Sequence, residues 1–412
     1  MRENTLDLWS SFVRQYWERK AALLTGEQAG VLPRIDPNEL FRAVVKCSGD
    51  FYRGGHQKVR FYVDGGEIDI LEGGNQIVLP RNEDGSFEGY HRRMVSRHKV
   101  QDYALIVADW HQFDRALWDR LLLSLEGLAE TVGISRSRID TQVFLGTYKV
   151  TPFGVHKDSR SGFHCPVIGA KTLRFWPAPF AEKTPGLRGA HNYQQFLEES
   201  VLLTAAVGDV IYWPSDHWHV GESDGSFSVT WGLGYWLGDG IRQLIVETLL
   251  KVLDRIESNA SAIPPEGVTK VARTLDGVDQ IMKDLQRAAS GEELRQSVAQ
   301  SWLQHHSAYG FLKVPPLLER VDVPGRGVVR NKPAVRILAS QIAPDSICVA
   351  AAGRSCVLPW SPSIPAIVDE LNQGDPVAIE DLFAFDEDRA AITLMIEFCL
   401  QSGALTLEDV TS

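Results

Sequence analysis

Three residues in two segments have the types and the spacing of a metal site. The segment TPFGVHKDSR contains His156 and Asp158 with one residue between them. In an extended segment, residues i and i+2 point to the same side, so both side chains can face one cavity while Lys157 points away. A second β-like segment, GDVIYWPSDHWHVGES, supplies His219. Two imidazoles and one carboxylate on one side of an ion leave the other side open, which suits non-haem Fe(II) and oxygen chemistry.

Other polar residues in the same two segments compete for a role. By alternation His217 can face inward as well as His219, and His-x-His is itself a plausible metal motif. His164 and Arg160 follow Asp158 in the first segment, where they can reach a substrate or have a structural or solvated role. The residue types alone therefore leave the third ligand open between His217 and His219.

The chain around these residues has the texture of a β core. From about residue 36 to 240, short runs such as KVRFYV, DYALIVADW, TQVFLG and SFSVTWGLGYW are rich in β-branched and aromatic residues and are bounded by Gly, Asp or Pro. One helical segment, DRALWDRLLLSLEGLAETVG, interrupts them. Many strands with few helices between them predict a sandwich or barrel rather than a βαβ repeat. Trp213, Trp218, Trp231 and Trp236 are expected to form its wall.

Helical and mixed segments flank this core. Residues 1–35 are predicted to be an N-terminal helical segment, and residues 241–310 a second helical segment. In GIRQLIVETLLKVLDRIE, apolar residues at positions 241, 244, 245, 249, 252 and 256 form a helical stripe. Three further apolar residues, Val246, Leu250 and Leu253, widen this stripe beyond one face of the helix. This predicts a homodimer, or coverage of both helix faces within one chain. After a Pro-rich linker, residues 326–412 alternate short apolar runs with helices, which predicts a small helix-plus-β-wing domain.

Composition and charge exclude several classes of protein. The chain has 412 residues, of which 44% are hydrophobic and 23% charged, so disorder is not expected. A net charge of −11 argues against a large nucleic-acid interface. No stretch has the length of an export signal core or a membrane span. Five scattered cysteines without C-x-x-C spacing indicate neither a disulfide framework nor a zinc-thiolate site. We therefore expect a cytoplasmic protein that binds neither membrane nor nucleic acid.

The motifs together resemble a known family. His-x-Asp followed by Lys171 in GAK, and then by GDVIYWP and WH, looks like the JmjC-type cupin oxygenases that depend on Fe(II) and 2-oxoglutarate. The branch is that of the hypoxia-inducible-factor asparaginyl hydroxylase and the ribosomal-protein hydroxylases, and the resemblance covers about residues 36–240. It implies a double-stranded β-helix of the cupin or jelly-roll type. It also implies iron ligation by His156, Asp158 and His219, since His219 has the family's spacing.

The resemblance implies further roles and an activity. Lys171 would bind the distal carboxylate of 2-oxoglutarate, and Thr151 matches a hydroxyl position that also serves the co-substrate; Tyr148 would pack or touch it. The implied activity is a dioxygenase that uses O₂ to hydroxylate an amino-acid side chain in a protein or peptide, releasing succinate and CO₂. The alternatives are a tailoring hydroxylase for a small natural product or free amino acid, N-methyl demethylation, and a catalytically dead cupin binding module. The intact triad counts against the last.

The C-terminal part resembles the winged-helix domain that follows the core in ribosomal-protein hydroxylases, and those relatives also dimerise through the helices after the cupin. Residues 326–412 contain six Lys or Arg and twelve Asp or Glu, a balance of 6 − 12 = −6. A negative surface does not favour DNA phosphates. We therefore expect this domain to contact a protein or peptide, or to brace the core.

Overall fold

The computed structural model describes residues 2–52, 58–70, 78–238, 240–253, 282–283, 285–287, 289, 291–385 and 389–408. The chain divides into two compact units. The first unit comprises Met1–Gly238 with Tyr309–Pro316, and the second comprises Asp239–Ala308 with Leu317–Ser412. Among the described helices, none is long and apolar enough to cross a bilayer.

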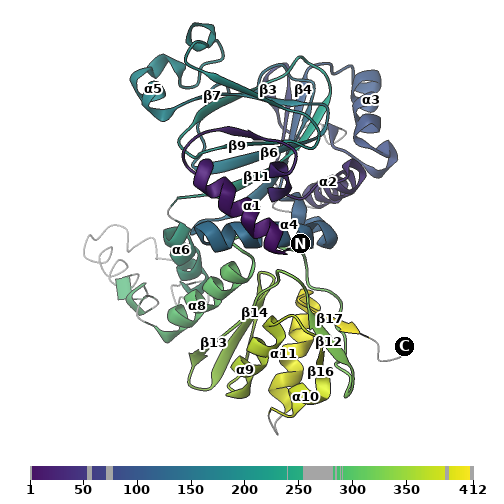
Figure 1. Cartoon of the computed structure of the whole chain (residues 1–412), viewed down its shortest axis with the longest axis vertical. Coiled ribbons are helices and arrows are strands. Elements are labelled where there is room, and N and C mark those ends of the chain that lie inside the picture. Colours follow the sequence, from purple (N-terminus) through teal and green to yellow (C-terminus); the bar gives the residue numbers. More distant parts are fainter. Residues whose placement is uncertain are drawn as a thin grey trace, which may run out of the picture. The chain divides into compact units, whose positions relative to one another are not determined.

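Two antiparallel sheets form the centre of the first unit (Figure 1). Within the described residues, the larger sheet has eight strands in the order β1-β9-β6-β11-β5-β4-β2-β3, and the smaller has three in the order β10-β7-β8. The strands are β1 (Ala22–Leu24), β2 (Val59–Val63), β3 (Gly66–Ile68), β4 (Tyr103–Ala108), β5 (Ile139–Gly146), β6 (Arg160–Ile168), β7 (Lys171–Trp176), β8 (Val201–Ala205), β9 (Val210–Trp213), β10 (Trp218–Glu222) and β11 (Ser228–Trp236). The predicted β core is therefore present as two antiparallel sheets. The expectation of one helical segment among its strands is wrong, because helices also form at Pro37–Tyr52, Phe87–His98 and Ala178–Lys183, and the unit is mixed α/β.

The outward face of the larger sheet packs against helices. Alternation along β6 and β11 turns Phe163 and Trp231 outward, and both are buried. Phe163 meets Trp9 of α1 (Arg2–Gln15) edge to face, with ring centroids 5.9 Å apart. The Trp9 indole also donates a hydrogen bond to the Ser124 carbonyl of α4 (Arg115–Val132) at 2.6 Å. Burial of these apolar side chains stabilises the contact between the sheet and the helices. The inward face of the sheet is then available for the polar residues described below.

The inward faces of the two sheets enclose a second core. It contains Leu173, Phe175, Ala205, Ile211 and Trp213, drawn from β7, β8 and β9. The outward face of the smaller sheet is covered by the insertion at residues 177–200, which packs Leu187 and Tyr193 on Trp176 and Val220. By alternation, side chains at 171 and 219 then share the space between the sheets with this core. The smaller sheet thus brings polar residues into a covered interior.

Local sequence signals set the ends of several other helices in the first unit. Asp114 caps α4 by accepting from the Leu117 amide at 3.1 Å, and α4 ends at Gly133, whose φ of 87° favours glycine. Ser86 caps α3 in the same way, through the Gly89 amide at 3.1 Å. The helices are α2 (Pro37–Tyr52), α3 (Phe87–His98) and α5 (Ala178–Lys183), with 3₁₀ turns at Gln28–Val31, Asn82–Asp84, Trp110–Phe113, Pro185–Leu187 and Gln194–Phe196.

In the part of the second unit that the structure describes, helices combine with two small antiparallel sheets. The sheets are β16-β12-β17 and β13-β14-β15. The elements are α6 (Gly240–Leu253), α8 (Glu292–Ser307), β12 (Val328–Asn331), β13 (Ile337–Ala343), β14 (Ser346–Ala351), β15 (Arg354–Pro359), α9 (Ser363–Asn372), β16 (Val377–Ala378), α10 (Ile379–Phe383), α11 (Arg389–Ser402) and β17 (Leu405–Glu408). The predicted alternation of strands and helices is present, whereas a winged helix and the domain boundaries stay predictions. Ile256 of the predicted stripe lies outside the described residues.

Candidate metal centre

A short antiparallel bridge brings the two predicted metal-binding segments together. The His156 amide donates to the His219 carbonyl at 2.9 Å, and the His219 amide donates back to the His156 carbonyl at 2.7 Å. This reciprocal pair places the two side chains on the same side of the backbone, with ring centroids 4.3 Å apart. Residues separated widely in the sequence are therefore held as direct neighbours by main-chain bonds.

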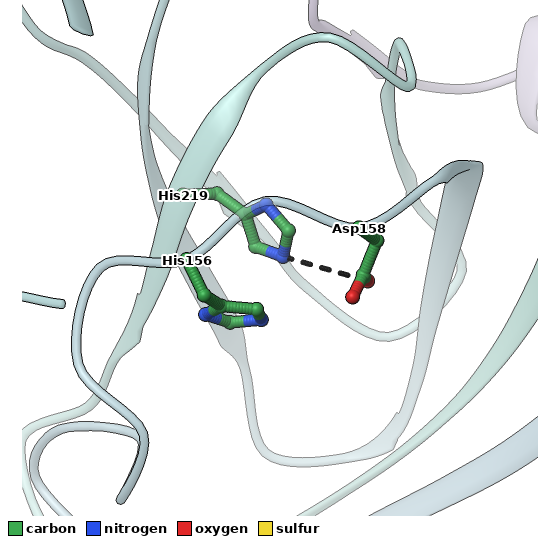
Figure 2. A group of neighbouring side chains, drawn as sticks. All are labelled: His156, Asp158 and His219. Atoms are coloured by element: carbon green, nitrogen blue, oxygen red, sulfur yellow. Dashed lines mark ion pairs between the residues drawn. The ribbon is translucent and has the colours of Figure 1, made fainter. Parts of the chain in front are cut away.

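Asp158 completes a cluster of three potential ligands (Figure 2). One ligand atom from each of His156, Asp158 and His219 lies within 4.8 Å of the others. The His219 Nε2 and the Asp158 Oδ2 are 4.0 Å apart. Lys157, between the first two residues, is exposed as alternation predicts. The three side chains thus converge on one point from one loop and one strand.

Backbone carbonyls set the tautomers of both histidines. The His156 Nδ1 lies 3.0 Å from the Gly154 carbonyl oxygen, and the His219 Nδ1 lies 3.3 Å from the His217 carbonyl oxygen. A carbonyl only accepts, so each Nδ1 carries the proton and each Nε2 keeps its lone pair. Metal-binding imidazoles are typically oriented in this way by their second nitrogen. The donor set therefore fits a divalent metal.

The electrostatics of the cluster favour the metal-binding protonation states. Burial lowers the pKa of His219 to about 3 and also lowers the pKa of His156. Burial alone would raise the pKa of Asp158, but Arg160 and the two imidazoles hold it below its ordinary value. Two neutral imidazoles and one carboxylate are the forms that bind a cation, since metal ligands must be deprotonated.

Arg160 braces the Asp158 carboxylate. Its Nε donates to Asp158 Oδ2 at 3.1 Å, its Nη1 to Asp140 Oδ1 at 3.0 Å and its Nη2 to Gln142 Oε1 at 2.8 Å. A Cβ at Gly234 would lie 2.5 Å from the Arg160 Nη1, so the strand needs glycine there for the guanidinium to lie flat. These hydrogen bonds hold the guanidinium in place, and the guanidinium in turn orients the Asp158 carboxylate.

Lys171 forms a second polar site in the same interior. It is 3% exposed and donates to the Tyr148 hydroxyl at 2.7 Å. A Cβ at Gly221 would lie 2.7 Å from the Thr151 Cγ2 and 3.2 Å from the Lys171 Nζ. The Thr151 Oγ1 accepts from the Gly221 amide at 3.2 Å. Among the described residues no carboxylate pairs with this buried ammonium, so the site suits an incoming anionic group.

The residues with open roles also have defined places. His217 Nδ1 lies 2.7 Å from Asp216 Oδ1, and among the described residues the metal cluster contains His219 instead. His164 is buried, and Arg160 contacts a candidate ligand. No sequence pattern points to Asp140 or Gln142, which hold Arg160 from β5, because only the register of β5, β11 and β6 brings them within reach of the arginine. Tyr148, predicted to pack or to touch the co-substrate, is the partner of Lys171.

Comparisons with known proteins show a likeness of fold. No family model matches the chain, and no curated protein matches it by sequence. The structure of YcfD, described as a ribosomal oxygenase from Escherichia coli, matches with a TM-score of 0.51 and 16% identity, covering 97% of this chain and 98% of that one.

A YcfD structure in complex with cobalt and 2-oxoglutarate matches with a TM-score of 0.52 and 15% identity, again covering 97% and 98%. Another, in complex with cobalt and succinic acid, matches with a TM-score of 0.51 and 15% identity over the same shares. The resemblance predicted for about residues 36–240 is thus confirmed as a likeness of fold, which extends over nearly the full length of the chain. The chain has the fold of these YcfD structures, and its described residues contain the His-Asp-His cluster.

Proposed function

We propose that the protein is an Fe(II)- and 2-oxoglutarate-dependent oxygenase that hydroxylates an amino-acid side chain in a protein or peptide. The cluster of His156, Asp158 and His219, with both Nε2 lone pairs free by tautomer, is the observation that carries the proposal. With 2-oxoglutarate and O₂, bound iron supplies oxidation of a C–H bond and yields succinate and CO₂.

We also propose that the two sheets form a double-stranded β-helix and that the C-terminal elements form a winged helix.

The chain's own residues bind and orient the reactants. Lys171 would pair with the distal carboxylate of the co-substrate, and the neighbouring Tyr148 and Thr151 hydroxyls would contact the same group. Arg160 fixes the Asp158 carboxylate, so that ligand does not rotate when the co-substrate enters. The apolar core of both sheets excludes water and strengthens these charged contacts.

One assay separates the enzyme from a binding module of the same fold. Purified protein with Fe(II), ascorbate and 2-oxoglutarate is expected to form succinate slowly without substrate, and Asp158→Ala should abolish this. A peptide library incubated with the active protein is then searched by mass spectrometry for the gain of one oxygen atom. Absence of succinate formation under all iron conditions would reject the proposed activity.

A polypeptide substrate is favoured over a small molecule by the second unit. Residues 326–412 carry the balance of −6 and contain none of the proposed ligands. Such a surface suits capture of a basic chain on either side of the target residue. The match to YcfD, described as a ribosomal oxygenase, is consistent with a protein substrate. Hydroxylation of free amino acids without activity on peptides would favour the small-molecule alternative.

We also propose a homodimer formed through α6. Ile245, Val246 and Leu250 on this helix are 43%, 55% and 55% exposed. Three large apolar side chains on one helix are costly in water unless a partner covers them. Light scattering at micromolar concentration should give twice the chain mass of 45.9 kDa, and a single chain mass would reject the dimer.

Cytoplasmic location and the lack of nucleic-acid binding stay predictions. Cell fractionation tests the location, and a gel-shift assay tests nucleic-acid binding.

A further inference from the structure

One buried histidine has no place in the roles assigned so far. His164 lies on β6, is 6% exposed, and its Nδ1 has no hydrogen-bond partner among the described residues. Its ring covers Gly232 on β11, where a Cβ would lie 2.7 Å from the His164 Cδ2 and 3.0 Å from its Nε2. The sheet thus makes room for this imidazole on its inward face by placing glycine opposite it.

The imidazole is one aromatic neighbour away from both the metal cluster and Lys171. On one side it meets the Trp213 ring at 4.8 Å between centroids, and Trp213 meets His219 at 5.0 Å. On the other side it meets the Phe144 ring at 4.9 Å, and the Lys171 Nζ lies 5.4 Å from the Phe144 centroid. His164 therefore shares an aromatic neighbour with each of the two polar sites, Trp213 with His219 and Phe144 with Lys171.

The protonation state gives His164 one donor and one acceptor. Burial lowers its pKa well below the ordinary value, and the nearby Lys171 and Arg160 act in the same direction. A neutral imidazole has one N–H and one lone pair. Leaving the Nδ1 buried without a partner is unfavourable, and a bound ligand that forms a hydrogen bond with it would remove this cost. The Trp213 Nε1, on the adjacent strand, is likewise buried and unpartnered among the described residues.

We propose that His164 donates a hydrogen bond to the oxo-acid end of a 2-oxo dicarboxylate, the end that faces the metal cluster. This inference rests on the proposed function and adds a positioning residue to it. The distal carboxylate already has Lys171 with Tyr148 beside it, whereas the other nearby cation, Arg160, is engaged by Asp158, Asp140 and Gln142. The contact series from His164 through Trp213 to His219 leads to the metal side.

Calorimetry on the full-length, Co(II)-loaded protein tests this assignment with three probes. They are 2-oxoglutarate, oxalate, which carries only the chelating end, and succinate, which lacks the oxo group. His164→Phe keeps an aromatic ring and removes both nitrogens. It is expected to raise the Kd of 2-oxoglutarate and oxalate by about tenfold or more and that of succinate by less than about twofold. His164→Gln, which retains an amide donor, should recover part of the loss.

Controls keep damage to the fold distinct from loss of the hydrogen bond. Co(II) affinity and the thermal unfolding midpoint should not change, and the partly exposed His98 at the end of α3, replaced by Phe, should alter no Kd. Unchanged binding of all three probes by His164→Phe would overturn the inference, as would equal weakening of oxalate and succinate. If the wild-type protein binds succinate and oxalate but the variant differs in neither, only the inference fails. If the wild type binds no probe, the proposed function fails with it.

Discussion

The two compact units bury different kinds of residue. In the first unit, Lys171, His219 and Arg160 are 3%, 4% and 8% exposed, and they lie in an interior shared with aromatic rings. In the second unit, β14 and α11 bury Ile347 and Ile392 at 0% exposure among other aliphatic side chains. Buried ionisable groups are costly to maintain, whereas buried aliphatic groups stabilise a fold directly. The first interior is therefore arranged for binding at some cost in stability, whereas the aliphatic core around β14 and α11 stabilises the second unit.

This difference predicts opposite consequences for substitutions. Changes in the interior of the first unit should alter binding and turnover more than stability. Changes in the interior of the second unit should alter stability and leave binding at the cluster intact. The predictions below test this contrast in order of decreasing effect.

The largest effect is expected at the cluster itself. Replacing His156, Asp158 or His219 by Ala should each abolish turnover and weaken Co(II) binding, because two remaining ligands hold a metal poorly. His217→Ala should keep substantial activity, since that side chain pairs with Asp216. Titration with Co(II) measures metal binding, and succinate formation measures turnover. A dead His217→Ala together with a metal-binding His219→Ala would reverse the assignment of the third ligand.

The next effect concerns the second interior. Ile392→Ala removes a fully buried side chain and should lower the free energy of unfolding of the second unit by about 2–5 kcal/mol. Ile392→Val should cost only about 0.5–1.5 kcal/mol. Urea denaturation followed by circular dichroism measures the loss, and Co(II) titration at low urea should give the wild-type affinity. Loss of Co(II) affinity without loss of stability would contradict the proposed separation of roles.

A smaller effect is expected at Lys171. Lys171→Ala should raise the apparent 2-oxoglutarate requirement at least about tenfold, because a hydrogen bond to a charged group contributes about 1.5–3 kcal/mol. Metal binding should survive. Succinate formation at varied 2-oxoglutarate gives the measurement. An unchanged requirement would move the carboxylate partner elsewhere. Arg174, on the same strand, already donates to Glu222 at 2.6 and 3.1 Å.

The sequence predicted the cluster because its signals are local. Strand alternation places His156 and Asp158 on one side, and the motif around His219 is contiguous. The two-sheet core followed from short β-branched and aromatic runs. The supporting residues were not predictable in this way. Gln142 meets Arg160 only through the register of β5, β11 and β6, which packing of the whole sheet sets.

Glycines and insertions show the same limit. In the sequence, Gly221 and Gly232 look like any glycine within a strand. In the structure, each leaves room for a polar side chain from another segment. The insertion at residues 177–200 has no periodicity, and its place over the smaller sheet depends on apolar contacts such as those of Leu187 and Tyr193. Tertiary neighbours of this kind come from the assembled fold, so sequence patterns point to the candidate ligands but not to the groups that hold them.

The smallest effect is expected on the surface of the second unit. Asp369, Asp375 and Asp381 are exposed there, and their carboxylates would attract a basic polypeptide if this surface captures the substrate. Replacing all three by Asn removes three charges and should raise the KM for a basic peptide substrate by about two- to fivefold at low salt. Exposed charges are screened beyond roughly 10 Å at 0.1 M salt, so the difference should shrink as salt is added. Uncoupled succinate formation, which needs no peptide, should not change. Steady-state kinetics at two salt concentrations give both values. A KM that is equal to wild type at low salt would mean that this unit contributes stability without capture, and the contrast between the two interiors would then extend to their surfaces.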